Sequence, residues 1–169
     1  DTQTPQGIVA VIQKEEVGLP DFSRGKFLFL EDVQDPGNVG TMIRTADAAG
    51  FTGVIVSDKS ADIYSLKTLR SMQGSHFHLP IYRMSLASFV EEAKKTAMPI
   101  LATTLSKESK DYRELSPLEA FVLVMGNEGQ GISSVMAESA DQLVHIGMKG
   151  RAESLNVAIA AGILMFYFS

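Results

Sequence analysis

The chain of 169 residues contains no cysteine and only three histidines, His76, His78 and His145. The absence of cysteine excludes disulfide bonds, thiolate nucleophiles, and zinc or iron–sulfur sites held by cysteine. It agrees with a reducing compartment, and we expect a cytoplasmic protein. The histidines form no H-E-x-x-H pattern, so no metal site is expected.

The sequence also lacks an excess of basic charge. It has 15 Lys and Arg residues against 20 Asp and Glu residues, a net charge of −5. Taken alone, this composition argues against a domain that binds nucleic acid mainly by charge. The first residues do not have the pattern of a signal peptide, so none is expected, and the apolar run over 155–168 is too short for a transmembrane span. We therefore expect no membrane partner, and we interpret this run as a buried helix that could contribute to a subunit interface.

Short apolar runs alternate with stretches of helical spacing along the chain. Strands are expected over residues 7–13, 27–32, 53–58, 79–84, 99–105, 121–127 and 142–148. Helices are expected over residues 38–50, 85–97, 132–140 and 154–168. This alternation predicts an α/β fold with a mostly parallel sheet flanked by helices on both faces. In such sheets, ligands bind in the loops that follow the carboxyl ends of the strands.

The first candidate motif begins with Asp35-Pro36-Gly37-Asn38, directly after an expected strand. Asn38 is a suitable N-cap for the next helix, and Arg44 lies within that helix's first two turns. A helix at the carboxyl end of a strand holds its first amide groups and an early arginine over the same crevice. This arrangement suits phosphate or another anion, although a capped helix with a surface arginine explains the same residues.

The second motif, G-N-E-G-Q-G over 126–131, lies between an expected strand and an expected helix. Glycine lets the backbone approach a ligand closely, although turns use glycine as well. The spacing differs from the G-x-G-x-x-G of dinucleotide-binding folds, and the sequence has no P-loop. Glu128 is either a structural brace of this loop or a group that faces a ligand.

The third motif joins the expected strand over 142–148 to the final apolar helix. Ser154 could simply cap that helix. Asn156 stands at the head of an apolar run, where a buried amide needs hydrogen-bond partners, so it either satisfies backbone groups or faces a ligand. Because all three motifs follow strands of one predicted sheet, they would converge on a single crevice.

Together the motifs resemble those of the SpoU (TrmH-like) RNA 2′-O-ribose methyltransferases of the SPOUT superfamily. The matching patterns are N-x-G-x-x-x-R-T-A (38–46), G-N-E-x-x-G (126–131) and I-x-M-x-G-x-x-E-S-L-N-V (146–157). The resemblance extends from about Gly25 to the end of the chain. One departure stands out, because Gly147 replaces the proline of the usual I-P-M. This change should loosen the cofactor loop without removing its backbone contacts.

The resemblance implies a C-terminal trefoil knot that holds S-adenosylmethionine, and an enzyme that transfers its methyl group to a ribose 2′-hydroxyl of RNA. The implied cofactor-binding residues are Thr103, Gly126, Ile146, Met148 and Leu155. The implied catalytic residues are Asn38, Arg44, Glu128, Ser154 and Asn156. We expect Arg44 to hold the target phosphate and hydroxyl while the other four fix Arg44 and the ribose, with Glu128 as the orienting partner of Arg44.

The resemblance also implies a homodimer with an active site shared across its interface. We expect residues 1–24 to form a linker remnant and a first strand, residues 25–169 to form the catalytic domain, and an N-terminal RNA-binding domain to precede them in the full protein. Ribosomal RNA is favoured over tRNA as the substrate. The alternative is a non-catalytic module of the same fold that binds RNA or S-adenosylmethionine. A nicotinamide-dependent oxidoreductase is disfavoured because the G-x-G-x-x-G pattern is missing.

Overall fold

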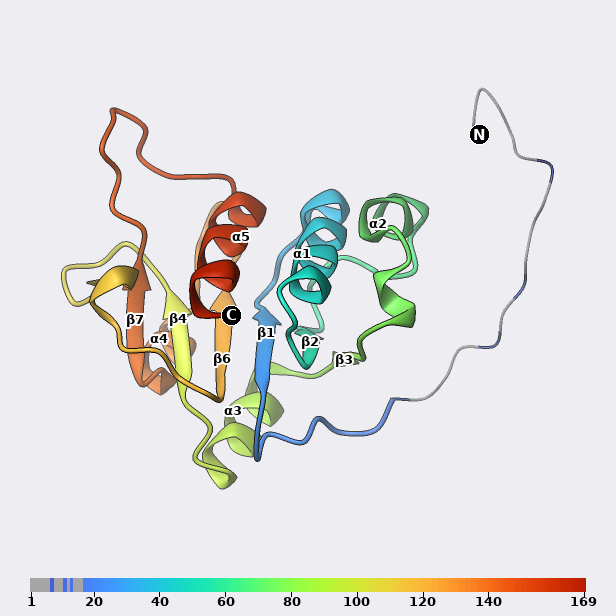
Figure 1. Ribbon diagram of the computed structural model, residues 1–169, viewed down its shortest axis with the longest axis horizontal. Coiled ribbons are helices and arrows are strands. Elements are labelled where there is room, and N and C mark those ends of the chain that lie inside the picture. The colour runs from blue at the N-terminus through green and yellow to red at the C-terminus, as the bar shows by residue number, and fades with distance from the viewer. Residues whose placement is uncertain (1–6, 8–10, 12, 14–16) are drawn as a thin grey trace.

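The computed structural model describes residues 7, 11, 13 and 17–169 (Figure 1). The strand expected over 7–13 lies outside the described residues, apart from three isolated positions. The elements, in chain order, are β1 (Lys26–Leu30), α1 (Pro36–Ala48), β2 (Gly53–Val56), α2 (Leu66–Met72), the 3₁₀ helix η1 (Ser75–Phe77), β3 (Ile81–Arg83), α3 (Leu86–Lys95), β4 (Ile100–Thr103), β5 (Lys110–Asp111), the 3₁₀ helix η2 (Tyr112–Glu114), β6 (Phe121–Met125), α4 (Ser134–Ser139), β7 (Gln142–His145) and α5 (Val157–Phe168).

The described strands form one seven-stranded sheet with the order β3-β2-β1-β6-β4-β7-β5. Every pairing in it is parallel. The strands β1 and β6 are neighbours inside the sheet, and Phe29 pairs in register with Ile55 of β2 and with Val124 of β6. Strands of this kind are covered on both faces, which explains their continuously apolar sequences. The predicted α/β fold with a mostly parallel sheet is confirmed.

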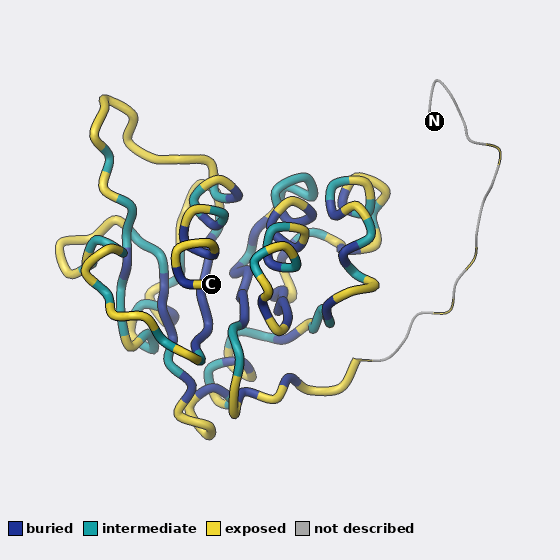
Figure 2. The backbone as a smooth tube through the Cα atoms, viewed as in Figure 1, coloured by how far each residue is buried: buried dark blue, intermediate teal, exposed yellow. Residues whose placement is uncertain are grey.

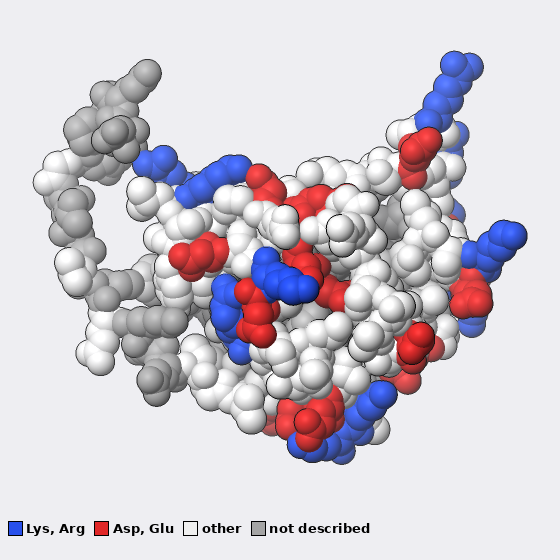
Figure 3. Space-filling model, turned by 180° about the vertical axis from the view of Figure 1, so that it is seen from behind, with Lys and Arg blue, Asp and Glu red and all other residues white. Residues whose placement is uncertain are grey.

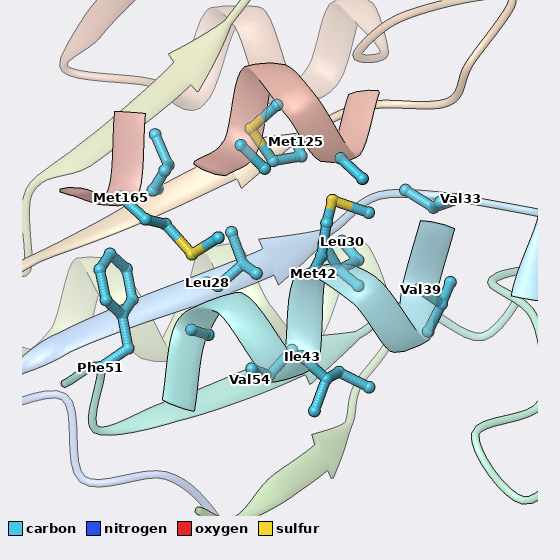
Figure 4. Packing of buried hydrophobic residues seen from close by; sticks show 14 of the residues in the cluster. Leu28, Leu30, Val33, Val39, Met42, Ile43, Phe51, Val54, Met125 and Met165 are labelled. Atoms are coloured by element: carbon cyan, nitrogen blue, oxygen red, sulfur yellow. The ribbon is translucent and has the colours of Figure 1, made fainter. Parts of the chain in front are cut away.

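Alternate residues of the strands enter two separate cores. Leu28 and Leu30 of β1 belong to the core beneath α1, α2 and α5, whereas Phe27 and Phe29 belong to the core beneath α3 and α4. Figure 4 shows the first of these cores, in which Met42 of α1 lies against the β1 side chains. Because successive strand residues point to opposite faces, a strand that is apolar throughout can bury helices on both sides. The expected helices on both faces are therefore present (Figure 1).

Besides the two short 3₁₀ helices, one α-helix and one strand are not among the elements expected from the sequence. Helix α2 has only seven residues, of which Thr68 and Met72 are buried, so its helical period is too short to recognise. Strand β5 consists of two polar residues, Lys110 and Asp111, and owes its conformation to pairing with β7. Both elements depend on packing against distant parts of the chain rather than on a local pattern.

The starts of α1 and α5 differ from the expected ones. The predicted capping role of Asn38 is wrong, and the alternative in which Ser154 caps the last helix does not hold. Asp35 caps α1, because its carboxylate accepts a hydrogen bond from the Asn38 N–H at 2.8 Å. Pro36 suits the first helical turn because it has no N–H that needs a partner there. Asn156 caps α5, and its side-chain oxygen accepts from the N–H groups of Ala158 and Ile159 at 2.9 and 3.3 Å. The side chains of Asn38 and Ser154 therefore have no capping role.

Helix α5 is apolar on all sides, but only one side is buried. Ala161 and Leu164 face the sheet, whereas Ile159, Ile163 and Phe166 remain 56%, 38% and 58% exposed. Figure 2 shows this division, with buried and exposed segments alternating along α5. The prediction of a buried helix is thus correct for one face only. Within the described residues, no helix is long and apolar enough to cross a membrane.

Candidate active site

A pocket of about 190 Å³ opens where β4, β6 and β7 end. Its walls come from the loops that follow these strands and from the start of α5. Each of the five residues that the resemblance assigns to the cofactor lines it: Thr103, Gly126, Ile146, Met148 and Leu155. Two of the implied catalytic residues, Glu128 and Ser154, line it as well. Positions far apart in the sequence thus meet at one site, at the edge of the sheet where ligands of parallel α/β folds bind.

The G-N-E-G-Q-G loop is closed tightly on itself. Asn127 and Gly131 exchange two backbone hydrogen bonds of 2.9 Å, and the Asn127 side-chain oxygen accepts from the N–H groups of Gly129 and Gln130. A Cβ on Gly126 would lie 2.3 Å from the carbonyl carbon of Gly131. Gly126 is therefore required because the backbone passes so close to it. The Asn127 side-chain amide also donates to the Asp32 carbonyl at 2.8 Å, which joins this loop to the start of the first motif.

Two polar side chains of the pocket wall have partners that restrict their chemistry. The Thr103 hydroxyl donates to the Val124 carbonyl at 2.8 Å, so it is engaged in bracing β4 against β6. The Ser109 hydroxyl donates to the Ser106 carbonyl at 2.7 Å and lies 3.0 Å from Nδ1 of His145. Since that hydroxyl has a single hydrogen and donates it to Ser106, it accepts a hydrogen bond from Nδ1 of His145. His145 lines the pocket, but the sequence gives no motif that would single it out as a site residue.

One row of polar side chains connects the three motifs. Glu128 accepts hydrogen bonds from the backbone N–H groups of Gln34 and Asp35, at 3.2 and 3.1 Å, and from the Asn38 side-chain amide at 3.1 Å. The oxygen of that same Asn38 amide accepts from the Asn156 side chain at 3.1 Å. Asn38, from the first motif, thus bridges Glu128 of the second and Asn156 of the third.

Glu128 is held in its charged form. Burial raises its pKa. The hydrogen bonds from Asn38 and from nearby backbone N–H groups together lower the pKa by more than burial raises it, so the net pKa lies below the usual value. Its carboxylate braces the loop that leads into α1, which supports the structural interpretation of this residue. Because it also lines the pocket, bracing and facing a ligand are compatible roles.

Arg44 lies apart from this row. Its side chain is exposed on α1, and none of the ion pairs and side-chain hydrogen bonds found among the described residues involves it. Among the described residues no hydrogen bond or ion pair joins Arg44 to Glu128, whose carboxylate instead accepts from Gln34, Asp35 and Asn38. Ser154 is also exposed, at the pocket wall in the loop that precedes α5.

The fold and the site together define an α/β protein with a small-molecule pocket in its strand-end loops and a polar row beside it. Residues 25–166 match the family model of the SpoU rRNA Methylase family, and the chain belongs to that family. The resemblance indicated by the three motifs is thereby confirmed.

Proteins that are similar to this chain in sequence are named as RNA methyltransferases. The chain is 46% identical over 167 residues to the 23S rRNA (guanosine(2553)-2′-O)-methyltransferase RlmP of Bacillus subtilis, covering 99% of this chain and 66% of that protein. It is 33% identical over 155 residues to a putative TrmH family tRNA/rRNA methyltransferase of Staphylococcus aureus, covering 91% of this chain and 60% of that protein. The chain therefore spans less than two thirds of the length of these relatives.

Solved structures share the fold. An AdoMet-bound rRNA methyltransferase from Sinorhizobium meliloti superposes with a TM-score of 0.80 at 42% identity, covering 83% of this chain and 54% of that one. The SpoU methyltransferase AviRb from Streptomyces viridochromogenes, in complex with AdoMet, gives a TM-score of 0.76 at 32% identity, covering 87% and 60%.

Proposed function

We propose that this chain is the catalytic part of an S-adenosylmethionine-dependent RNA 2′-O-ribose methyltransferase, with ribosomal RNA favoured over tRNA. The observation that carries the proposal is that residues of the second and third motifs line one pocket. Beside it, Asn38 of the first motif is hydrogen-bonded to Glu128 and Asn156. The names of the relatives support the same reaction and the same class of RNA.

The pocket suits the adenosine part of the cofactor. Apolar side chains of Met125, Ile146, Leu155 and Leu164 line it, and its loops also present backbone groups, as at Gly126. An aromatic base binds well between apolar walls whose backbone groups hydrogen-bond its edge. The cofactor supplies an activated methyl group on a sulfonium. We assign Thr103, Gly126, Ile146, Met148 and Leu155 to cofactor binding, mainly through backbone contacts and packing.

The chain's own residues supply position and charge. Arg44 has a permanently protonated guanidinium with five donors, which suits it to hold a phosphate and the target hydroxyl rather than to remove a proton. Asn38, Glu128 and Asn156 form the polar row that holds the start of α1, the helix that carries Arg44, against the pocket. We assign Ser154, exposed at the pocket wall, to contact with the target ribose. Such positioning contributes because the attacking oxygen and the methyl carbon must be brought into line.

We further propose a homodimer with a shared active site. The exposed apolar face of α5, formed by Ile159, Ile163 and Phe166, has the i, i+4, i+7 spacing of one helix face. Helix α1 packs against α5, because Thr45 Cγ2 lies 3.7 Å from the place of a Cβ on Gly162. Arg44, exposed on α1, is then available to a site completed by a second copy. A trefoil knot formed by the second and third motifs belongs to the same proposal.

The net charge of −5 supports weak RNA affinity for this part of the protein. On the face in Figure 3, basic and acidic side chains are interspersed, with no continuous basic patch. A few well-placed cations can position one ribose, whereas tight binding needs many phosphate contacts. We therefore propose that residues 25–169 form the catalytic domain and that a further RNA-binding domain, N-terminal to it, supplies most of the affinity. A cytoplasmic location follows from an RNA substrate of this kind.

The function is tested by calorimetry with S-adenosylmethionine, followed by transfer of labelled methyl to ribosomal RNA and to tRNA. Cofactor binding with transfer to ribosomal RNA supports the proposal. Binding without transfer to either RNA, with the full-length protein, favours the non-catalytic alternative.

The role of Arg44 is tested by Arg44→Lys, which keeps the charge but loses the bidentate fork. We expect turnover to fall about 100-fold while cofactor affinity is unchanged, because the substitution removes positioning and not the pocket. Arg24→Lys, at another exposed arginine outside the site, is the matched control. Near-normal turnover of Arg44→Lys would contradict the assigned role.

A further inference from the structure

In the third motif, Gly147 lies between two residues that line the pocket, and the structure shows what lies against it. A Cβ on Gly147 would stand 2.9 Å from Oδ2 of Asp111. The Gly147 backbone N–H is also among the groups that lower the pKa of the Asp111 carboxylate. Gly147 does not adopt a left-handed φ, so its backbone conformation does not call for glycine. The side chain of Asp111 is therefore what distinguishes this position.

Asp111 is firmly held by its neighbour Arg113. The guanidinium Nε and Nη2 donate to Oδ1 and Oδ2 at 2.7 and 2.8 Å, and the Arg113 backbone N–H adds a bond of 3.1 Å. The Asp111 side chain is only 14% exposed, and that of Arg113 is 55% exposed. These bonds, chiefly those from the Arg113 side chain, lower the pKa of Asp111, and the Gly147 N–H contributes in the same direction. A bidentate pair of this kind fixes the carboxylate in orientation as well as in charge.

The same carboxylate stands beside the edge of the cofactor pocket. Strand β5 pairs with β7 so that Asp111 lies opposite His145, which lines the pocket. The next residues, Ile146 and Met148, line the pocket on either side of Gly147. Asp111 therefore contacts the middle of the segment whose flanking residues form the pocket wall.

Proline and glycine restrict this segment in opposite ways. A proline at position 147 would fix φ through its ring and would remove the N–H. The glycine of this chain lacks that restraint, but its N–H is available to a carboxylate and its missing Cβ leaves room for one. An external hydrogen bond can thus provide the restraint that the ring provides from within the backbone.

We propose that Asp111, held by Arg113, is a positioning residue that fixes the 146–148 edge of the cofactor pocket through its contact with Gly147. The proposal rests on the function proposed above, because it assigns a role in binding S-adenosylmethionine. It does not make Asp111 a catalytic residue, since Asp111 acts through the backbone of Gly147.

The test is a double-mutant cycle with Asp111→Ala and Gly147→Pro, in which S-adenosylmethionine affinity is measured by calorimetry. Asp111→Ala should weaken binding about tenfold, because the carboxylate that lies against Gly147 and orders the pocket edge is lost. Gly147→Pro alone should weaken binding at least as much, because the ring meets Oδ2 and the N–H is removed. In the double variant the obstruction is gone and the ring restrains the loop, so affinity should return to within about threefold of wild type. Glu108→Ala, an exposed acid in the same segment, is the control.

Two further readouts separate positioning from general stability. KM for the cofactor should rise in Asp111→Ala while kcat at saturation changes little, and the melting temperature without ligand should stay close to that of wild type. Asp111→Asn, which keeps an acceptor oxygen and the shape of the side chain, should lie between wild type and Asp111→Ala. Additive losses in the double variant, or an Asp111→Ala affinity equal to that of wild type, would overturn this inference alone. A wild-type protein that fails to bind S-adenosylmethionine would instead overturn the proposed function.

Discussion

The tight loop of the second motif provides a sharp prediction, Gly126→Ala. The added methyl group would lie 2.3 Å from the Gly131 carbonyl carbon, 2.4 Å from the Ile132 nitrogen and 2.5 Å from the Gly131 oxygen. All three atoms belong to the backbone, so no side chain can rotate away to make room. Gly126 does not have a left-handed φ, and the prediction therefore depends on space alone.

The size of the effect follows from the distances. Carbon atoms in contact normally stand about 3.5–4.0 Å apart, so the loop must open by about 1 Å. Overpacking of this kind destabilises a protein by about 1–3 kcal/mol, and strain on the two Asn127–Gly131 hydrogen bonds acts in the same direction. Because the loop forms part of the pocket wall, a displacement of this size should also weaken S-adenosylmethionine binding, by about 100-fold.

Urea denaturation and calorimetry measure the two effects. The matched control is Gly129→Ala in the same loop, where the nearest atom to the added Cβ is the Asn127 side-chain oxygen at an ordinary 3.7 Å. Gly129→Ala should change the free energy of unfolding by less than about 0.5 kcal/mol and should leave cofactor affinity intact. If the two alanine variants behave alike, the close approach of the backbone at Gly126 does not govern the pocket, and the reasoning is refuted.

Two other predictions concern the polar row and the core. Glu128→Gln replaces one carboxylate oxygen by an amide nitrogen that must face an N–H donor, and it should destabilise the fold by about 1 kcal/mol, a value moderated by solvent exposure. The pKa of Glu128 is lowered in the folded state, so its stabilising contribution is present above the usual glutamate pKa and is lost as the pH falls through the lowered pKa. Glu128→Gln should therefore flatten that part of the acid denaturation profile. An unchanged profile would contradict the assignment. Phe29 is fully buried and its ring stacks on Phe89 at 4.2 Å, so Phe29→Ala should lower the free energy of unfolding by about 3–5 kcal/mol, against a small change for Phe77→Ala, whose side chain is 69% exposed.

Local sequence determined most of the framework. The apolar runs around Phe29 and Val124 predict buried parallel strands, because only strands covered on both faces are continuously apolar. The predicted helix starts were wrong where another residue nearby in the sequence is the one that caps the helix. Asp35 and Pro36 start α1 two residues before Asn38, and Asn156 caps α5 in place of Ser154. Helix α2 is too short to give a recognisable period.

The three motifs could also be recognised in the sequence, since each depends on residues close together in the chain. Their arrangement in space could not be predicted, because the hydrogen bond between Asn38 and Glu128 joins residues 90 apart in the sequence and the one between Asn38 and Asn156 joins residues 118 apart. Hydrogen bonds of this kind are decided by strand order and by side-chain direction, which no local pattern encodes. The tertiary structure therefore decided that Glu128 braces the start of α1 instead of pairing with Arg44. It also decided that Asp111, from a two-residue strand, lies against Gly147 in the third motif.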